Sequence, residues 1–538
     1  MKSYTKIVKA VAGSLLLAVL TGLAGCANTS QNTDRGGAEQ KPNIIFIMAD
    51  DHARRTVSAY GDSINHTPNI DRLADEGAKF ENSFVANSIC NPSRASILTG
   101  KHAHKHGVVG NASPWDNDQT LLPGQLQQAG YTTALIGKWH LNSPPGEEFD
   151  YSNRLTGAGK QGFYYNPEFE SGNGIKETVR GYSTNIVADK AIRWLGSNTD
   201  SREQPFTLFM QFKAPHVPRM PYFRYLDKYE EDTIPEPETL FDDYDTRLPY
   251  AREANMGMHY NPLPLAGEHE PEDHLYFKRF TEEQLARYHS YKDPETREYR
   301  SLKRQGRLEG KQGKKFAYQK FIKDYLRIID GVDHNVGRVL DWLDEHPDIK
   351  ENTIVVYTSD QGYFTGEHGW AEKRFMYEES IRIPLLMRWE DHIEAGREVE
   401  AMVQNIDFAP TFLDLAGIEI PEDMQGRSFA PLLKGEKPGD WRQSIYYHYY
   451  DHGGHNVPRH DGVRTERYKL INFYTEQKWE FYDLEKDPNE VHNRYGDPEY
   501  GNIIQNLKNE LDELRKQYEV PEDHFEAPYI RAGRDQQL

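Results

Sequence analysis

Short apolar runs alternate along the chain with stretches that have helical periodicity. The first run, residues 41–49 (KPNIIFIMA), is almost continuously apolar, which is typical of a strand buried on both faces of a parallel sheet. Similar runs occupy residues 131–136, 206–212, 353–358 and 384–388. These five runs therefore predict the strands of one central, mostly parallel sheet.

Helical patterns lie between the predicted strands. Residues 67–77 and 93–100 predict short helices, and residues 184–196 and 403–416 predict longer ones. The clearest helix is expected at residues 318–345, where apolar residues recur at steps of three and four: Phe321, Tyr325, Ile328, Val332, Val336, Val339 and Leu343. The alternation of strands and helices predicts a doubly wound α/β domain, with helices flanking the sheet.

Two segments depart from this alternation. Residues 219–315 are charged, rich in Tyr and Pro and poor in aliphatic residues, so we expect an insertion over the active face of a domain that spans 41–440. From residue 441 the pattern changes again, with strands expected at 444–450 and 469–473 and a helix at 501–517. Residues 441–538 are therefore predicted to form a smaller C-terminal α+β domain.

A glycine-rich segment at residues 157–162 (GAGKQG) matches the G-x-G-x-x-G pattern of dinucleotide sites. That pattern works only between a buried strand and a helix, and we find neither beside it. We interpret the segment as a loop.

The N-terminus has the pattern of an export signal. Lys2, Lys6 and Lys9 precede an apolar stretch at residues 10–20, which is too short to span a membrane comfortably. Residues 23–26 (LAGC) resemble the bacterial lipobox, in which signal cleavage leaves a lipid-modified cysteine, here Cys26. We expect a signal peptide at 1–26 and a flexible polar tether at 27–40.

An ordinary signal peptide with a chance cysteine is the alternative. Ala27 after the cysteine, in place of Asp, resembles lipoproteins that are sorted to an outer membrane, provided that the source is Gram-negative. The expected location is thus an exported, lipid-anchored protein at the outer membrane or cell surface, otherwise in the periplasm.

The amino-acid composition of the chain limits which classes of ligand it is expected to bind. The chain has 538 residues, of which 37% are hydrophobic and 28% charged, so a large core is expected. The formal net charge of −20 disfavours nucleic acid, because phosphate binding requires clustered Lys and Arg. A small anionic substrate remains compatible with the charge, since a local pocket can be basic on an acidic protein.

The chain contains only two cysteines. If Cys26 carries lipid, Cys90 has no disulfide partner. An unpaired cysteine in an oxidising compartment is expected to be buried, a ligand or reactive. The residues that follow Cys90 favour the reactive role.

Residues 90–100 (CNPSRASILTG) resemble the signature of the type I sulfatase family, C-x-P-S-R-x-x-x-L-T-G, at every fixed position. The resemblance implies the alkaline-phosphatase-like α/β fold of that superfamily. It also implies that a separate maturation enzyme converts Cys90 to Cα-formylglycine (3-oxoalanine), whose hydrated aldehyde is the nucleophile. A divalent metal, usually calcium, accompanies it.

Carboxylates follow two of the predicted strands. Asp50 and Asp51 end the first run, and Asp360 and Gln361 follow residues 353–358. Ligands in open α/β sheets bind at the carboxyl ends of strands, and oxygen donors suit Ca²⁺ or Mg²⁺ better than Zn²⁺. We predict that these four residues hold the metal together with modified Cys90; the family often has Asn where Gln361 stands.

The remaining catalytic candidates are basic. By resemblance, Arg94, Lys138 and Lys373 neutralise the sulfate, and Arg94 holds the formylglycine diol. Histidine titrates near neutral pH, which suits acid and base roles. The resemblance implies that His140 takes the proton of the second diol hydroxyl, and that His216, together with Lys373, protonates the leaving oxygen.

The family uses its C-terminal region to select the sugar. Among the tyrosines and turn residues of this region we predict four substrate contacts, with a solvated polar loop as the alternative: His455, Arg459, His460 and Arg464.

Together these patterns predict an exported sulfatase acting on a sulfated polysaccharide or oligosaccharide. Algal ulvan and glycosaminoglycans both remain open as substrates. One alternative is a phosphatase or phosphodiesterase of the same superfamily, but such enzymes pair two zinc ions with a Thr or Ser nucleophile, and Cys90 disfavours them. The other is a non-catalytic, carbohydrate-binding surface lipoprotein, which would not require the complete catalytic set.

Overall fold

The structure, a computed structural model, describes residues 40–61, 64–198, 204–259, 265, 275–451 and 454–526. The predicted signal peptide, Cys26 and nearly all of the predicted tether lie outside the described residues. Residues 41–538 form one compact unit. Within the described part of the chain, the helices are all too short or too polar to cross a membrane.

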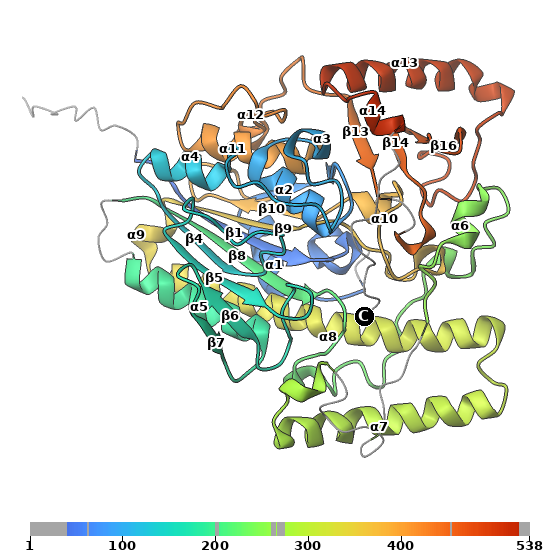
Figure 1. The fold of residues 1–538 in the computed structure, drawn as a ribbon, viewed down its shortest axis with the longest axis horizontal. Helices are drawn as coiled ribbons and strands as arrows, with labels where there is room; N and C mark the ends of the chain where they lie inside the picture. Colours follow the sequence, from blue (N-terminus) through green and yellow to red (C-terminus); the bar gives the residue numbers. More distant parts are fainter. Residues whose placement is uncertain are drawn as a thin grey trace, which may run out of the picture. The chain divides into compact units, whose positions relative to one another are not determined.

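A ten-stranded sheet forms the centre of this unit, in the order β11-β2-β10-β9-β1-β8-β4-β5-β6-β7 (Figure 1). Its middle consists of five parallel strands: β9 (Thr353–Ser359), β1 (Asn43–Asp50), β8 (Phe206–Pro215), β4 (Thr132–Gly137) and β5 (Tyr151–Thr156). The outer strands are β10 (Leu385–Arg388), β2 (Ala78–Phe80), β11 (Arg397–Val399), β6 (Glu168–Ser171) and β7 (Lys176–Thr178). The mostly parallel sheet confirms the predicted fold class.

The register of the middle strands brings their carboxyl ends together. Ile44 of β1 lies opposite Thr207 of β8 and Ile354 of β9, so the three strands run side by side in the same direction. The residues of β8 and β9 are buried, and those of β1 are buried from the second onward, which explains their continuous apolar runs. Residues that follow these strands therefore meet at one edge of the sheet.

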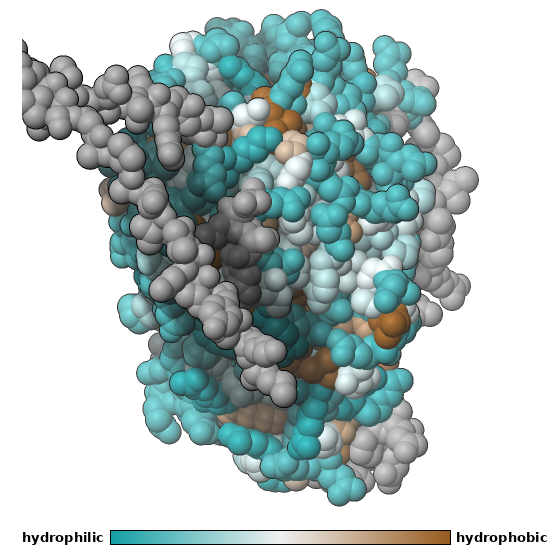
Figure 2. Space-filling view, turned by 90° about the vertical axis from the view of Figure 1, so that its left-hand side faces the viewer, coloured by the Kyte–Doolittle hydropathy of each residue, from teal (hydrophilic) through white to brown (hydrophobic). Residues whose placement is uncertain are grey.

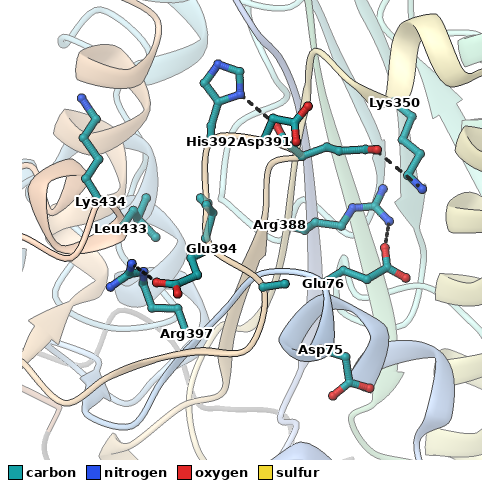
Figure 3. Close-up of a pocket in the computed structure, with 13 residues that line it drawn as sticks. Asp75, Glu76, Lys350, Arg388, Asp391, His392, Glu394, Arg397, Leu433 and Lys434 are labelled. Carbon is teal, nitrogen blue, oxygen red and sulfur yellow. Dashed lines mark hydrogen bonds and ion pairs between the residues drawn. The ribbon is translucent and has the colours of Figure 1, made fainter.

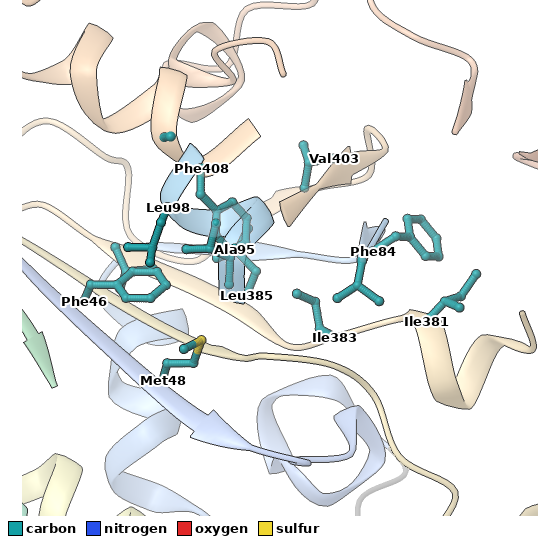
Figure 4. Packing of buried hydrophobic residues seen from close by; sticks show 14 of the residues in the cluster. Phe46, Met48, Phe84, Ala95, Leu98, Ile381, Ile383, Leu385, Val403 and Phe408 are labelled. Atoms are coloured by element: carbon teal, nitrogen blue, oxygen red, sulfur yellow. The ribbon is translucent and has the colours of Figure 1, made fainter. Parts of the chain in front are cut away.

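Helices cover both faces of the sheet (Figure 1). On one face, α1 (Pro68–Asp75), α5 (Ser183–Asn198) and α8 (Gly310–Asp344) pack against Ile45 and Ile47. On the other, α2 (Cys90–Thr99), α4 (Leu122–Gln128) and α11 (Phe408–Leu415) pack against side chains that include Phe46 and Met48 (Figure 4). Alternate residues of β1 thus serve opposite layers, as strand geometry requires.

The insertion expected at residues 219–315 contains a long helix that was not predicted. This helix, α7 (Glu282–Arg304), begins with a capping box formed by Thr281 and Gln284, and α8 follows it. Helix α8 starts eight residues before the predicted 318, because its first turns carry few apolar residues. Earlier in the insertion, Gly257 bridges to Trp370, which places residues 255–258 against the segment that leads to Lys373.

The C-terminal residues form a separate antiparallel sheet, which contains the strands predicted at 444–450 and 469–473 and two that were not predicted. Its strands are β13 (Ser444–Tyr449), β14 (His460–Thr465), β15 (Tyr468–Phe473) and β16 (Lys478–Asp483). Helix α13 (Gly501–Gln517) packs on this sheet through Leu507 and Leu511. The remaining elements with α or β labels are β3 (Ser83–Phe84), α3 (Ala103–His106), α6 (Pro249–Glu253), α9 (Pro347–Lys350), α10 (Glu378–Ile381), β12 (Val403–Gln404), α12 (Ala430–Leu433) and α14 (Asp523–Glu526).

The glycine-rich segment at 157–162 needs a correction. A largely buried strand, β5, does precede it, so that part of our interpretation was wrong. The next element is the strand β6, which begins at Glu168 and pairs with β5, so no helix lies directly after the segment. Gly157, Gly159 and Gly162 all have positive φ, which a loop of this shape requires.

The surface is largely polar on the face drawn in Figure 2. Its hydrophobic residues form small separate groups. Exposed single hydrophobic residues are ordinary on a folded protein, and this face therefore suits contact with water or a polar ligand.

Candidate active site

The predicted catalytic and metal-binding residues converge at the carboxyl edge of the sheet. Four neighbouring strands supply them: Asp50 and Asp51 at the end of β1, Lys138 and His140 after β4, His216 after β8, and Asp360 and Gln361 after β9. Cys90 and Arg94 come from α2, and Lys373 follows the Trp370 segment. All ten side chains are buried.

Cys90 is the first residue of α2, so the positive end of the helix dipole lies at the site. Its side chain is buried, and Nε2 of Gln361 lies 3.5 Å from Sγ. Burial raises the pKa of the Cys90 thiol to about 12. The unmodified thiol is therefore neutral at physiological pH and a poor nucleophile, because the thiolate is the reactive form.

Each of the three carboxylates pairs with a different base. Lys138 donates to Asp50, and Nζ of Lys373 lies 2.7 Å from both carboxylate oxygens of Asp51. Nε of Arg94 donates to Oδ2 of Asp360 at 3.0 Å. The three bases that were predicted to neutralise a sulfate thus surround one cluster of carboxylates.

Electrostatics inside the cluster oppose three ionised carboxylates. Burial raises the pKa of Asp51 despite Lys373, and Asp50 raises it further. Burial and the charge of Asp50 also raise the pKa of Asp360. Burial works in the same direction on Asp50, but Lys138, His216 and Arg94 together hold its pKa well below the usual range. Additional positive charge would stabilise this arrangement.

The donor set fits a hard divalent cation. Ligand atoms of Asp50, Asp51, Cys90 and His216 lie within 4.8 Å of one another. Within the described part of the chain, two buried oxygens, Oδ1 of Asp50 and Oε1 of Gln361, accept no hydrogen bond, although Nη2 of Arg94 lies 3.6 Å from the first. Buried oxygens without a donor are rare, and carboxylate and amide oxygens are the ligands that Ca²⁺ and Mg²⁺ prefer.

The two histidines have different surroundings. Nδ1 of His216 lies 2.9 Å from the carbonyl oxygen of Val217, and Nε2 lies 3.8 Å from Oδ2 of Asp51. Nδ1 of His140 is buried and has no hydrogen-bond partner among the residues that the structure describes. Burial lowers the pKa of both rings well below the usual range, and Lys138 adds to the effect. The negative charge of a bound sulfate ester would oppose this shift.

The backbone is strained at the same place. Asp51 has φ of 69° and His140 has φ of 67°, in the left-handed region that residues other than glycine rarely adopt. Such strain persists where the surrounding structure holds it, and it clusters at functional sites.

Three polar residues of the site were missed by the sequence reasoning. Gln211 Oε1 accepts from Arg94 at 2.7 Å, and Gln161 Oε1, from the glycine-rich loop, lies 3.2 Å from Nζ of Lys138. Lys213, also on β8, is buried behind His216. The signal for Gln211 and Lys213 was present, since both interrupt an otherwise apolar strand.

The four predicted substrate contacts do not share one environment. His455 is half-buried, with Nε2 3.5 Å from Glu372, the residue before Lys373. His460 has no exposed surface and stacks between the rings of Tyr447 and Tyr449. These rings give His460 a packing role.

Arg464 and Arg459 are also buried. Nε and Nη2 of Arg464 pair with Glu378 at 3.2 and 3.1 Å, on the part of β14 that lies farther from Tyr449. Burial and this bidentate pair favour a structural role for Arg464. His455 is therefore the candidate best placed for a substrate, and the substrate-contact role itself stays a prediction for all four residues.

A surface pocket of about 710 Å³ lies at the opposite end of the sheet (Figure 3). Arg388, at the end of the antiparallel strand β10, points into it and pairs with Glu76, while Arg397 pairs with Glu394. Its charged side chains largely neutralise one another, and its lining includes none of the predicted site residues.

Comparison with known proteins agrees with this geometry. Residues 42–418 match the family model described as Sulfatase, and residues 366–517 match the model described as N-sulphoglucosamine sulphohydrolase, C-terminal. The chain belongs to the sulfatase family. It is a sulfuric ester hydrolase with the alkaline-phosphatase-like fold.

Individual relatives cover most of this sulfatase. It is 44% identical over 529 residues to an N-acetylglucosamine-6-O-sulfatase from Bacteroides thetaiotaomicron, a match that covers 95% of this chain and 92% of the relative. A solved structure of a protein in complex with its substrate D-glucosamine-2-N,6-O-disulfate is 43% identical, with a TM-score of 0.86, and covers 90% of this chain and 99% of that one. An ulvan-active sulfatase from Formosa agariphila is 24% identical over 501 residues, 87% of this chain and 78% of the relative.

Proposed function

We propose that this sulfatase removes the 6-O-sulfate from glucosamine or N-acetylglucosamine units of a sulfated carbohydrate. The observation that carries the proposal is the likeness along nearly the whole chain to a relative with that activity, at 44% identity. The much lower identity to an ulvan-active enzyme, 24%, makes algal ulvan the weaker candidate. Of the two substrate groups that the sequence left open, glycosaminoglycan-type sugars are therefore favoured.

We propose that formylglycine made from Cys90 supplies the oxygen nucleophile, and that a separate maturation enzyme produces it. The complete signature at residues 90–100 and the neutral, buried thiol support this assignment. Arg94, at the same helix, is placed to hold the modified side chain, since it already lies beside Asp360 in the site.

The other residues bind and move protons. Lys138 and Lys373 supply positive charge where the sulfate oxygens carry negative charge, which lowers the energy of the transition state in a buried site. His216 is assigned as the acid that delivers a proton to the leaving sugar oxygen from Nε2. His140 is assigned as the base that takes a proton when sulfate is released.

Asp50, Asp51, Asp360 and Gln361 would hold a divalent cation, Ca²⁺ in our proposal, beside modified Cys90. Such an ion supplies Lewis-acid stabilisation of negative charge on a sulfate oxygen. The two buried oxygens that lack donors support the assignment.

Export and lipid anchoring through Cys26 stay part of the proposal. They rest on the N-terminal sequence pattern, which lies outside the described residues. Labelling of cells with a radioactive fatty acid tests them, because Cys26→Ser should abolish incorporation and leave the protein unprocessed.

Sulfate release from defined sugars tests the substrate. Wild-type enzyme is incubated with glucosamine derivatives that carry one sulfate each, at N2, O3 or O6, and with sulfated disaccharides from glycosaminoglycans and from ulvan. We expect the 6-O-sulfate to be released with the highest kcat/KM. Preferential release from another position or from the ulvan disaccharide would contradict the proposed substrate, while leaving the sulfatase assignment intact.

Removal of the metal should abolish most activity, because the negative charge of the three carboxylates would then oppose binding of the sulfate. Calcium added back should restore activity. It should also raise the Tm of the chelated protein, since a ligand at 100 times its Kd adds about 2.7 kcal/mol of stability.

Asp360→Asn should lose both responses to calcium. Asp341→Asn is the matched control, because Asp341 is an exposed carboxylate on α8 that pairs only with Arg72 among the described ion pairs. Full activity after exhaustive chelation, with no calcium-dependent change in Tm, would refute the metal assignment.

A further inference from the structure

Lys213 is a buried cation for which the mechanism above gives no role. Its residue is only 2% exposed, at the end of the fully buried strand β8 and three residues before His216. Among the described residues, no carboxylate lies within the 4.0 Å of an ion pair with its amine. Burial of an ammonium without a paired carboxylate is costly, so a specific use of this charge is expected.

The Lys213 amine is directed at the turn that carries His216. Its Nζ donates to the carbonyl oxygen of Val217 at 3.0 Å and lies 5.3 Å from the centre of the Tyr164 ring. The Tyr164 hydroxyl donates to the carbonyl oxygen of His216 at 2.6 Å. Two consecutive carbonyl groups of this turn are thus held by side chains from the buried part of the domain.

The Val217 carbonyl also orients the imidazole ring. Nδ1 of His216 lies 2.9 Å from this oxygen. A carbonyl oxygen can only accept, and it has two lone pairs, so it can receive the protons of both the Lys213 amine and His216 Nδ1. Nδ1 must therefore carry a proton, which leaves Nε2 as the atom that faces Asp51, 3.8 Å away.

The two hydrogen bonds depend on one acceptor. If the lysine is removed, the Val217 carbonyl loses one of the two donors that fix its direction. The His216 ring, which is held by the same oxygen, then loses its defined orientation. A catalytic group displaced by about 1 Å can lose roughly 10²-fold in rate.

We propose that Lys213 is a positioning residue, which holds the Val217 carbonyl and through it directs Nε2 of His216 to the leaving oxygen of the substrate. The inference rests on the proposed role of His216 as the acid. Burial and nearby Lys138 lower the pKa of the Lys213 amine to about 7. The amine carries N–H protons in both protonation states, so it can donate to the Val217 carbonyl in either state.

The test is Lys213→Met, which removes the amine and keeps most of the aliphatic stem. Turnover of a sugar sulfate should fall about 10²-fold, and turnover of an activated aryl sulfate should fall much less, because a good leaving group does not need the proton. The Tm should stay unchanged or rise, since an unpaired buried charge is lost. Thr207→Val, a buried substitution at the far end of the same strand, is the matched control and should change neither activity.

A double-mutant cycle separates positioning from a general structural effect. In a His216→Ala background, Lys213→Met should cause no further loss, because the ring that it orients is absent. Losses that multiply in the double variant, or equal losses on both substrates for Lys213→Met alone, would overturn the proposal.

Two further outcomes have a defined interpretation: failure of Lys213→Met to fold, and equal losses on both substrates for His216→Ala. If Lys213→Met does not fold, Lys213→Arg takes its place, because arginine keeps the charge and a donor. This variant must retain the wild-type preference between the two substrates. A preference like that of His216→Ala would overturn the proposal. If His216→Ala itself affects both substrates equally, the acid assignment fails. The cycle would then still report whether the two residues act together.

Discussion

Replacement of Cys90 by alanine should abolish sulfate-ester hydrolysis while the fold stays intact. Removal of a nucleophile together with its activating chemistry costs about 10⁶-fold in hydrolases where it has been measured. The fold should survive because one small buried side chain replaces another, and among the described residues the sulfur accepts only the long hydrogen bond from Gln361. Release of sulfate from a 6-O-sulfated sugar measures the first effect, and thermal unfolding measures the second.

Mass spectrometry provides the control for this prediction. In wild-type protein produced with its maturation enzyme, the peptide that contains residue 90 should be about 18 Da lighter than its sequence requires, because CH₂SH becomes CHO. Protein produced without that enzyme should have the unmodified mass and little activity. Full activity in protein that retains the thiol would contradict the formylglycine assignment.

Replacement of His216 by alanine should reduce desulfation of a sugar by roughly 10²–10⁴-fold, the range for general acid catalysis. A sugar alkoxide is a poor leaving group and requires the proton, whereas a nitrophenolate does not. Hydrolysis of an aryl sulfate should therefore be affected far less. Comparison of kcat for the two substrates checks the prediction, provided that chemistry limits both reactions.

His140→Ala is the matched control for the acid. His140 is assigned to the release of sulfate, a step that no longer involves the leaving alcohol. Its loss should therefore impair both substrates to a similar extent. If His216→Ala also impaired both substrates equally, His216 would bind or orient the sulfate and would not be the acid.

The central strands β1, β8 and β9 were predictable because nearly all of their residues are buried. The apolar runs at 41–49, 206–212 and 353–358 correspond to β1, β8 and β9 to within a few residues. A short, continuously apolar run in an α/β domain is typical of a strand in the buried centre of the sheet. Helix α7 could not be predicted in the same way. It is largely polar, with only three buried residues, and it gains its stability from α8 and from a capping box.

The four predicted substrate contacts in the C-terminal region show that composition alone does not predict where a side chain points. His455, Arg459, His460 and Arg464 look alike in a sequence rich in Tyr, His and Arg. In β14, however, His460 belongs to a stack of aromatic rings and Arg464 forms an ion pair with Glu378. His455 precedes β14 and lies beside Glu372, the residue before Lys373. Side-chain direction in a strand depends on register with its neighbours, which the local sequence does not encode.

The sequence by itself determined the family of this sulfatase and predicted its chemistry. The signature at residues 90–100 predicts a modifiable cysteine with its arginine. The polar residues directly after apolar strands predict donors at the carboxyl edge of a parallel sheet. These features are local, so they can be recognised without knowledge of the fold.

Only the tertiary structure decided which residues act together. The order of β9, β1, β8 and β4 brings Asp360, Asp51, His216 and Lys138 into one buried cluster, although they are far apart in the chain. The same packing pairs Asp50, Asp51 and Asp360 with Lys138, Lys373 and Arg94. It also places the Lys213 amine against the carbonyl oxygen of Val217, next to Nδ1 of His216. Pairing, burial and orientation depend on residues from distant segments, and they arise only when the sheet forms.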